Sequence, residues 1–212
     1  MKKICYIVGA GDVPEKKIII GDSDYIICAD AGYKHMGIFS RQPDLVIGDF
    51  DSLGAVPDFE NKIVLPPEKD DTDMTLAVSE GIKKGYDTFV IFGGLGGERM
   101  DHSIANIQLL HFICEKGCIG FLVNGSRIFT AIKNRKASFS NECEGYISVF
   151  SLTDKSEGVT IKNLKYELCD YTMKNSAVLG VSNEFIGEKA EIEVKNGVLL
   201  LSWQGSFTDL ST

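Results

Sequence analysis

The chain has 212 residues, of which 44% are hydrophobic and 25% charged, a composition ordinary for a globular protein that buries a substantial core. Its net charge of -8 argues against a general binder of nucleic acid or of anionic membranes, because such proteins use a basic surface to displace counterions. Any anionic substrate must therefore be bound with the help of local cations or a metal.

The start of the chain and its cysteines both point to the cytoplasm. Two lysines precede a short apolar run at 4–8, but no long apolar core or small-residue cleavage site follows, and no run approaches the ~18 apolar residues of a membrane span. Cys5 and Cys28 lie in apolar runs, which indicates reduced core thiols. Cys114 and Cys118 are one helical turn apart without a second Cys or His pair nearby, so we expect no zinc site there.

Up to about residue 124, short apolar runs alternate with helix-like segments. One helix is predicted over 72–85, and a second over 101–117 that buries Ile104, Ile107 and Leu110. Continuous apolar runs separated by crossovers are typical of a parallel sheet that is buried on both faces by helices. The expected strands are 4–8, 25–28, 45–47, 62–65, 88–92 and 119–123.

After residue 124 the pattern changes to short alternating segments, which predicts an all-β sandwich over 126–212. Asn196-Gly197 lies between the last two segments and is a strong signal for a two-residue hairpin. We therefore expect two domains, 1–125 and 126–212. The expected strands of the second are 127–132, 146–152, 158–161, 177–181, 190–194 and 198–203.

Polar side chains follow four of the predicted strands of the first domain. Asp30 follows the second strand, Asp49 and Asp51 follow the third, the segment 69–73 follows the fourth, and the glycines 93–97 follow the fifth. The carboxyl ends of parallel strands form one rim, and ligands bind in the crevice outside it. These groups, far apart in sequence, are therefore expected to converge on one cleft.

The acids in this cleft suit a metal ion. Asp49 and Asp51 are a carboxylate pair of the kind that binds magnesium together with water and phosphate oxygens, although an acidic turn is the alternative. The segment 69–73 sets three acids beside Lys69 where a helix opens, and a solvated helix cap is its alternative. Asp30 ends an apolar strand, where an unpartnered charge is costly, and a metal would be such a partner.

The glycines 93–97 are suited to phosphate. Their backbone amides can approach a phosphate closely, the helix that begins near Asp101 points its positive end at the same region, and Arg99 would complete an anion site. The pattern is neither a Walker loop nor a dinucleotide fingerprint, and a flexible turn is the alternative. For His102, a capping or structural hydrogen bond is favoured over proton transfer.

In this order, the motifs resemble those of the thiamine pyrophosphokinase family over about residues 4–205. Ala31 is a departure, because the family commonly has glycine there. The resemblance implies a homodimer in which a Rossmann-like α/β domain, 1–125, binds ATP and metal and a β-sandwich, 126–212, binds thiamine and dimerises. The matching motifs are Asp30-Ala31-Gly32, Gly48-Asp49-Phe50-Asp51-Ser52, Lys69-Asp70-Asp71-Thr72-Asp73, Gly93-Gly94, Arg99-Met100-Asp101-His102 and Ser182-Asn183.

The resemblance also implies a reaction, in which the terminal diphosphate of ATP moves to the hydroxyethyl group of thiamine, with Mg²⁺ present and AMP released. Ser182 and Asn183 would lie at a thiamine pocket shared between subunits. Trp203 would stack on thiamine, although core packing is favoured for it. Carried over by position, the metal and catalytic residues are Asp30, Asp49, Asp51, Asp70, Asp73 and Arg99, and the nucleotide and phosphate residues are Asp30, Lys69, Thr72, Gly93, Gly94, Arg99, Asp101 and His102.

The residues and the resemblance agree on an in-line attack of an alcohol oxygen at the β-phosphorus. Two other functions stay open at this point. One is a pyrophosphokinase that acts on another alcohol, such as a hydroxymethylpterin. The other is a non-catalytic sensor of a nucleotide or of thiamine diphosphate, against which the many mutually repelling carboxylates argue.

Overall fold

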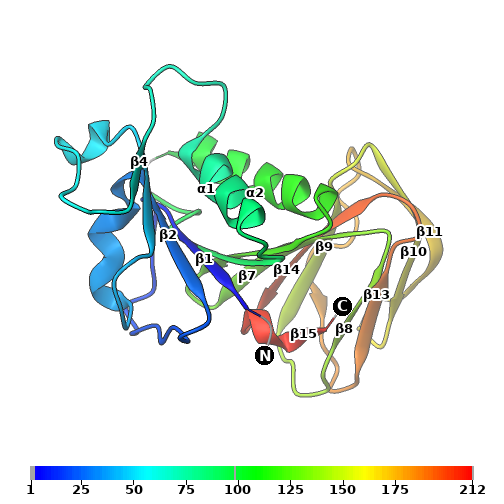
Figure 1. The fold of residues 1–212 in the computed structure, drawn as a ribbon. Coiled ribbons are helices and arrows are strands. Elements are labelled where there is room, and N and C mark those ends of the chain that lie inside the picture. The colour runs from blue at the N-terminus through cyan, green and yellow to red at the C-terminus, as the bar shows by residue number, and fades with distance from the viewer. Residues whose placement is uncertain (1–2, 98, 212) are drawn as a thin grey trace. The chain divides into compact units, whose positions relative to one another are not determined.

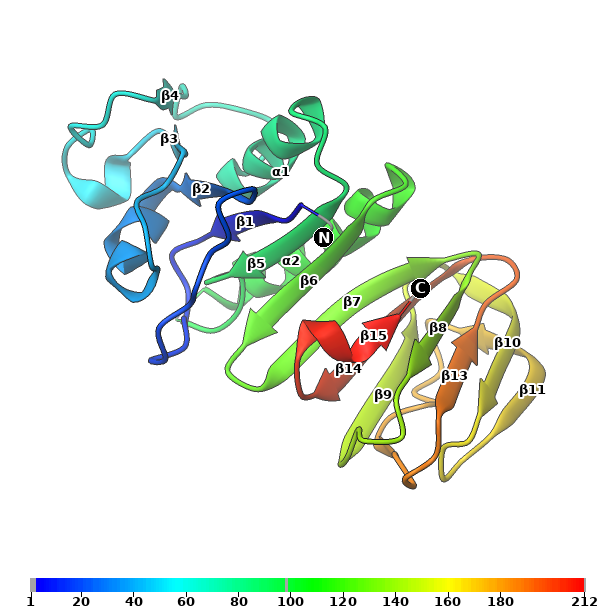
Figure 2. The same cartoon turned by 60° about the horizontal axis from the view of Figure 1, so that its bottom comes forward.

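The structure is a computed structural model that describes residues 3–97 and 99–211 (Figures 1 and 2). The chain forms two compact units, one made of the residues up to 109 with 122–125, the other of 110–121 with 126–212. The division passes within helix α2 (Met100–Glu115) and strand β6 (Ile119–Asn124). Among the described residues, no helix has the length and apolar character needed to cross a membrane.

A parallel sheet forms the centre of the N-terminal unit, as the apolar runs predict. Its strands lie in the order β5-β1-β2-β3-β4, and each neighbouring pair is parallel. Every residue of β1, β3 and β5 is buried, but Lys62 and Val64 of β4 are exposed because β4 is the last strand of this order. The strands are β1 (Cys5–Val8), β2 (Tyr25–Ala29), β3 (Leu45–Gly48), β4 (Lys62–Val64) and β5 (Thr88–Phe92).

Helix α1 (Asp73–Lys83) packs on β1, β2 and β3. The backbone N–H of Thr75 donates to the side chain of Thr72, which caps the helix at its start. Its buried residues include Ala77 and Val78, which the helical spacing predicts to face the core. This helix is therefore placed by a cap and by an apolar face that the sequence already shows.

The prediction for the apolar face of α2 is partly wrong. Leu110 and Ile113 are buried, but the side chain of Ile104, in the second turn, is 55% exposed. The first turns of α2 therefore present an apolar side chain to solvent, and the helix is buried mainly towards its end.

Two short 3₁₀ helices that the sequence did not predict follow β2 and β3. They are η1 (Asp30–Ile38) and η2 (Asp51–Leu53), and each begins with an acid of the predicted site. In η1, a Cβ added to Gly32 would lie 2.0 Å from the backbone oxygen of Val8, so only glycine allows η1 to lie this close to β1.

The C-terminal unit contains two antiparallel sheets, which confirms the predicted all-β half. One has the strand order β7-β14-β9-β12, and the other β11-β10-β13-β8-β15. The strands are β7 (Arg127–Lys133), β8 (Lys136–Phe139), β9 (Tyr146–Ser151), β10 (Lys155–Lys162), β11 (Leu168–Lys174), β12 (Asn183–Glu184), β13 (Ala190–Glu193), β14 (Val198–Gln204) and β15 (Leu210–Ser211).

The predicted hairpin at Asn196-Gly197 is wrong. Strand β13 pairs with β8 and β10, whereas β14 pairs with β7 and β9, so the turn carries the chain from one sheet to the other. Gly197 has φ +120°, and the backbone N–H of Glu157 donates to the carbonyl of Asn196 at 2.7 Å. Asn196 does not share the positive φ that a two-residue hairpin turn of this type requires at both central positions, so neither the turn nor the partner of the strand that follows is as predicted.

The predicted strand at 177–181 is also wrong. This segment is a loop in which Gly180 has φ +97°, a left-handed conformation that interrupts a strand. Val178, Leu179 and Val181, which suggested a strand, are exposed. The strands on either side of this segment are β11, whose residues are mostly exposed, and the two-residue strand β12.

Candidate functional site

Three carboxylates meet at the carboxyl ends of β2 and β3. One oxygen each from Asp30, Asp49 and Asp51 lie within 4.8 Å of one another. Because Ala29 and Ile47 are partners in the parallel register, the residues that follow the two strands emerge side by side. The convergence that the sequence predicts for these three acids is therefore present. We call these three residues the carboxylate cluster.

Left-handed backbone turns these acids toward one another. Asp30 has φ +47° and Phe50, between the two other acids, has φ +61°, conformations that are uncommon for residues other than glycine. The side chain of Phe50 is only 2% exposed and so anchors this turn in the core. A Cβ added to Gly48 would lie 3.0 Å from the Cα of Asp30, so the two strand ends meet at a glycine.

Asp30 has a buried carboxylate oxygen without a partner. Its Oδ1 atom accepts no hydrogen bond within the described ranges 3–97 and 99–211. A buried oxygen of this kind costs free energy unless something binds it. Its position beside two other carboxylates indicates a cation as the missing partner, as proposed from the sequence for the end of this strand.

Lys69 connects the carboxylate cluster to α1. Its Nζ donates to Asp49 Oδ2 at 2.8 Å and lies 3.1 Å from Asp73 Oδ1, in an ion pair whose geometry is outside that of a hydrogen bond. The side chain of Lys69 is only 14% exposed. Asp73, which the sequence grouped with the metal ligands, therefore joins the cluster through Lys69 and is not one of its three converging acids.

The pKa values of these groups diverge. The hydrogen bond from Lys69 lowers the pKa of Asp49, whereas burial raises the pKa of Asp73 despite the nearby ammonium group. Burial acts to lower the pKa of Lys69, but the two carboxylates outweigh it and the pKa is raised. The pKa values of the two acids that share one lysine are thus shifted in opposite directions, that of Asp49 chiefly by the hydrogen bond from Lys69 and that of Asp73 chiefly by desolvation.

The glycines 93–97 pack against a second glycine loop, Gly9–Asp12, that the sequence reasoning missed. The backbone N–H groups of Gly11 and Asp12 donate to the carbonyls of Gly93 and Leu95 at 2.8 and 3.0 Å. A Cβ on Gly11 would lie 2.7 Å from the oxygen of Leu95, so the approach requires glycine. The only sequence signal for this loop is the Gly-Ala-Gly-Asp run directly after β1, a strand end for which no site residue was predicted.

Arg99 and Asp101 form an exposed pair at the start of α2. The guanidinium donates two hydrogen bonds to the carboxylate, from Nε at 2.9 Å and from Nη2 at 2.7 Å. Arg99 lowers the pKa of Asp101 to about 2. The planar fork of Arg99 is therefore held by a neighbouring acid and remains open to solvent on its other side.

The remaining residues predicted for the nucleotide site lie around this rim. Asp70 and His102 are exposed, and Thr72 caps α1. The side-chain amide of Asn106 donates to the carbonyl of Gly94 at 2.7 Å and fixes the glycine loop to α2. Ala31, where the family commonly has glycine, does not have the positive φ that would require glycine.

Ser182 and Asn183, predicted at the acceptor pocket, lie in the C-terminal unit and differ in exposure. Ser182 is exposed and has φ +57°. Asn183 is buried, donates to the carbonyl of Tyr166 at 2.6 Å and accepts from the N–H groups of Tyr166 and Glu184 at 2.9 Å. The amide of Asn183 is thus engaged with backbone, and it fixes the position of Ser182 beside it.

Trp203 has the core packing that the sequence favoured. Its side chain is 0% exposed and contacts Phe121 and Phe139 edge to face. The indole Nε1 donates to the carbonyl of Ser206 at 3.2 Å and to Asp209 Oδ2 at 3.3 Å. Both the ring and its polar atom are therefore engaged inside the C-terminal unit.

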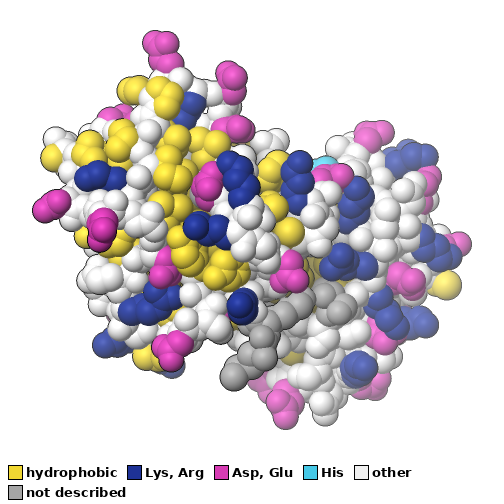
Figure 3. All heavy atoms as spheres, in the orientation of Figure 1, with side chains coloured by type: hydrophobic (Ala, Val, Ile, Leu, Met, Phe, Trp, Pro, Cys, Tyr) yellow, Lys and Arg dark blue, Asp and Glu magenta, His cyan; other side chains and the backbone are white. Residues whose placement is uncertain are grey.

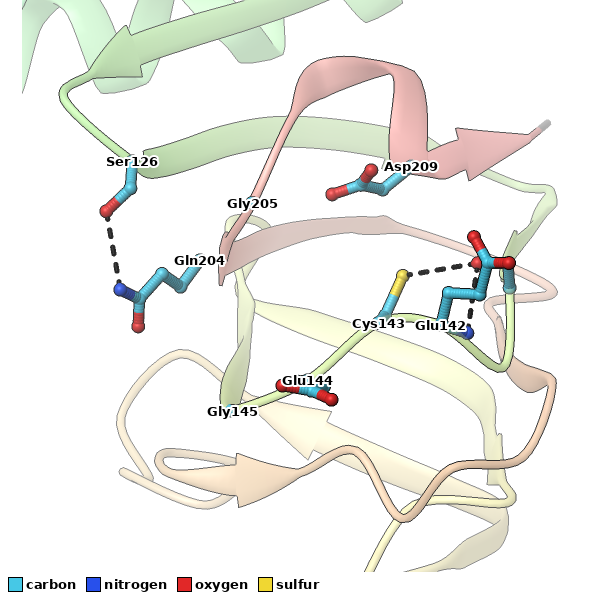
Figure 4. Close-up of a pocket in the computed structure, with 9 residues that line it drawn as sticks. Ser126, Glu142, Cys143, Glu144, Gly145, Gln204, Gly205 and Asp209 are labelled. Atoms are coloured by element: carbon cyan, nitrogen blue, oxygen red, sulfur yellow. Dashed lines mark hydrogen bonds between the residues drawn. The ribbon is translucent and has the colours of Figure 1, made fainter.

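A cavity of about 550 Å³ lies in the C-terminal unit (Figure 4). Three acids line it, Glu142, Glu144 and Asp209, and its lining includes neither a lysine nor an arginine. Ser182 and Asn183 are not among its lining residues.

On the face of the molecule in Figure 3, basic side chains are interspersed with acidic ones in both units.

Comparisons with known proteins give a consistent result. A family model described as thiamin pyrophosphokinase, catalytic domain, matches residues 17–119, and one described as thiamin pyrophosphokinase, vitamin B1 binding domain, matches residues 133–199. The chain is 28% identical over 169 residues to a thiamine pyrophosphokinase of Bacillus subtilis (strain 168), a match that covers 75% of this chain and 77% of that protein.

Solved structures share the fold over nearly the whole chain. A crystal structure of thiamine pyrophosphokinase from Bacillus subtilis matches with a TM-score of 0.82 at 24% identity, over 97% of this chain and 100% of that one. Thiamin pyrophosphokinase from Candida albicans matches with a TM-score of 0.73 at 16% identity, over 96% of this chain and 89% of that one.

Proposed function

This chain belongs to the thiamin pyrophosphokinase family and is a thiamine pyrophosphokinase, and from that premise we propose that its carboxylate cluster is the site of diphosphate transfer. The enzyme transfers a diphosphate group from ATP to thiamine and releases AMP. Family membership decides against the hydroxymethylpterin and sensor alternatives. The observation that carries the site is the convergence of Asp30, Asp49 and Asp51, one of them with a buried, unpartnered oxygen.

The donor set fits magnesium. Mg²⁺ prefers carboxylate oxygens at about 2.0–2.1 Å and usually keeps several positions for water and phosphate oxygens. Three carboxylates within 4.8 Å, one with an unsatisfied buried oxygen, offer such ligands with modest adjustment. We propose Asp30, Asp49 and Asp51 as the residues that would hold the ion. When bound, the ion would neutralise phosphate charge and favour departure of AMP.

The protein's own groups position the polyphosphate. The glycines 93–97 offer backbone amides at the rim of the sheet, where α2 also begins. Arg99, held by Asp101, would bind a phosphate through its open side. Alignment of the two reacting groups for in-line attack is the main contribution of these residues, since phosphoryl transfer depends on positioning and charge stabilisation.

Asp73 is the candidate acceptor of the thiamine hydroxyl proton. The sequence left this role open among the acids. Burial raises the pKa of Asp73, while Lys69 lowers that of Asp49, so Asp73 is the stronger base of the two acids that share Lys69. Lys69, which pairs with Asp49 of the cluster, also pairs with Asp73 and so keeps it beside the cluster.

The acceptor site and the dimer are proposed in the C-terminal unit. Ser182 would contact thiamine, and Asn183 would act by holding Ser182 in place. Seven large apolar side chains of the C-terminal unit are exposed, and we call them together the apolar edge: Tyr146, Tyr166, Tyr171, Val178, Leu179, Val181 and Ile186. Exposed apolar side chains that gather on one face commonly mark an interaction surface. They support our proposal of a homodimer in which the subunits share the active sites.

For the domain boundaries and the cellular compartment, we propose what the sequence predicts. We propose 1–125 as the ATP and metal domain and 126–212 as the thiamine-binding and dimerisation domain, in keeping with the two family models. Cys5, Cys28, Cys114, Cys143 and Cys169 are free thiols, which supports the cytoplasm as the compartment.

An assay of AMP release with ATP, thiamine and Mg²⁺ tests the site. Asp51→Asn removes one charge from the carboxylate cluster and is expected to lower kcat/KM at least about 100-fold, because charge stabilisation at the phosphates is lost. Asp58→Asn, an exposed acid outside the cluster, is the control and should retain activity. Near-normal turnover of Asp51→Asn would exclude the cluster as the site.

A further inference from the structure

Lys69 competes with any cation for the acids around it. Among the described residues, it is the only cation in an ion pair with Asp30, Asp49, Asp51 or Asp73. The contact is sheltered, since the side chains of Lys69 and Asp49 are 14% and 13% exposed. Screening by water and salt is therefore weaker here than for a surface pair.

Asp49 belongs to two arrangements at once. One of its oxygens is part of the carboxylate cluster, and its Oδ2 accepts the hydrogen bond from Lys69 at 2.8 Å. A divalent cation held by the cluster would therefore share one carboxylate with an ammonium group. Two positive centres this close repel each other strongly in a partly buried site.

A polyphosphate removes this conflict. It brings negative oxygens that bind both the ion and an ammonium group, so each positive centre gains a partner while Asp49 is shared. Asp73, the second acid beside Lys69 at 3.1 Å, keeps the ammonium group on the α1 side of the cluster. The same lysine would thus oppose a cation that arrives alone and favour one that arrives with phosphates.

We propose that Lys69 is a positioning residue that prevents the carboxylate cluster from retaining a free divalent cation, so that the metal binds together with the nucleotide's polyphosphate. The inference rests on the proposed function of the cluster and adds the chemical form in which the site takes its metal. It also assigns Lys69 a role toward the ion, in addition to the phosphate contact that the resemblance implies.

The test measures Mn²⁺ binding by electron paramagnetic resonance, without nucleotide and without turnover. Lys69→Gln removes the charge and keeps a hydrogen-bond donor, and it is expected to bind free Mn²⁺ at least about tenfold more tightly than the unmodified protein. Lys69→Arg keeps the charge and should bind Mn²⁺ within about threefold of the unmodified protein. With a non-hydrolysable ATP analogue added, Lys69→Gln should lose this advantage, because the lost ammonium group also served the phosphates.

A purely structural lysine would give a different pattern. Lys69→Gln would then lose stability and bind Mn²⁺ equally or more weakly, and that result in a folded variant overturns the proposal. Lys69→Met is the second variant if Lys69→Gln does not fold. If neither variant folds, the Kd of the unmodified protein for free Mn²⁺ is the test. Dedicated oxygen-ligand sensor sites bind with a Kd tighter than about 10 µM, so a Kd in that range overturns the proposal. A weaker Kd agrees with it.

This experiment is separate from the test of the proposed function. If Asp51→Asn retained AMP release, the cluster would not be the catalytic site, whatever Lys69 does to Mn²⁺. If AMP release depends on Asp51 but Lys69→Gln binds free Mn²⁺ no more tightly, only the role of Lys69 fails.

Discussion

Two residues in left-handed conformation set the geometry of the site. Asp30 and Phe50 each hold a positive φ at a cost of about 1–3 kcal/mol, and such strain persists only where the surroundings enforce it. The buried ring of Phe50 provides that enforcement for Asp49 and Asp51. The packing of Phe50 in the core therefore fixes the positions of the carboxylates of Asp49 and Asp51, its two neighbours in sequence.

Gly32 is predicted to make a large contribution to the stability of the N-terminal unit. In Gly32→Ala, the new Cβ would lie 2.0 Å from the backbone oxygen of Val8, which cannot move away without disturbing β1. We expect a loss of about 2–4 kcal/mol in the free energy of unfolding, measured by urea denaturation. Gly37→Ala in the same 3₁₀ helix is the control, because a Cβ there meets nothing within 4 Å and should change stability little. Equal stability of the two variants would refute this account.

Two roles of Thr72, as the cap of α1 and as a phosphate contact, can be separated by substitution. The structure assigns it the cap of α1, whereas the resemblance implies a phosphate contact. Thr72→Ala should lower the free energy of unfolding by about 1 kcal/mol, and Thr72→Asn should restore it, since Asn is a good cap. If the hydroxyl also binds phosphate, Thr72→Asn will retain stability but show a higher KM for ATP. A normal KM in that variant would leave the cap as the whole role.

The sequence predicted elements well where one chain segment carries the signal. The apolar face and cap of α1, the buried parallel strands, and the convergence of Asp30, Asp49 and Asp51 all follow from periodicity and from the position of acids after strands. These features depend on local pattern and on one topological rule.

Features that depend on the partner of a segment were not predictable in this way. The turn at Asn196-Gly197 joins two sheets, and nothing in its residues specifies which strand β14 will pair with. Likewise, the Gly9–Asp12 loop acquires its role only by lying against the glycines 93–97. The double pairing of Lys69 depends on side-chain placement that sequence spacing does not determine.

At the scale of the whole molecule, we expect dimerisation to depend on the apolar edge. Val178, which is 84% exposed, lies in the loop whose Gly180 carbonyl accepts from the N–H of Val149. Val178→Asp places a charge in the proposed interface and should raise the Kd of the dimer at least about tenfold, as measured by sedimentation velocity. Ile19→Asp is the control, since Ile19 is 74% exposed in the N-terminal unit. Dissociation of the control but not of Val178→Asp would place the interface elsewhere.

Because the two units divide within α2 and β6, the N-terminal unit is not a continuous stretch of the chain. Residues 110–121 belong with the C-terminal unit, where Phe121 contacts Trp203 and Phe207. A fragment that ends at residue 125 would keep the carboxylate cluster and the whole of α2, but residues 110–121 would lose the C-terminal unit to which they belong, including the contacts of Phe121 with Trp203 and Phe207. A cut after residue 125 is therefore expected to leave exposed an apolar surface that the intact chain buries, and a stable fragment with the carboxylate cluster would have to end at another point.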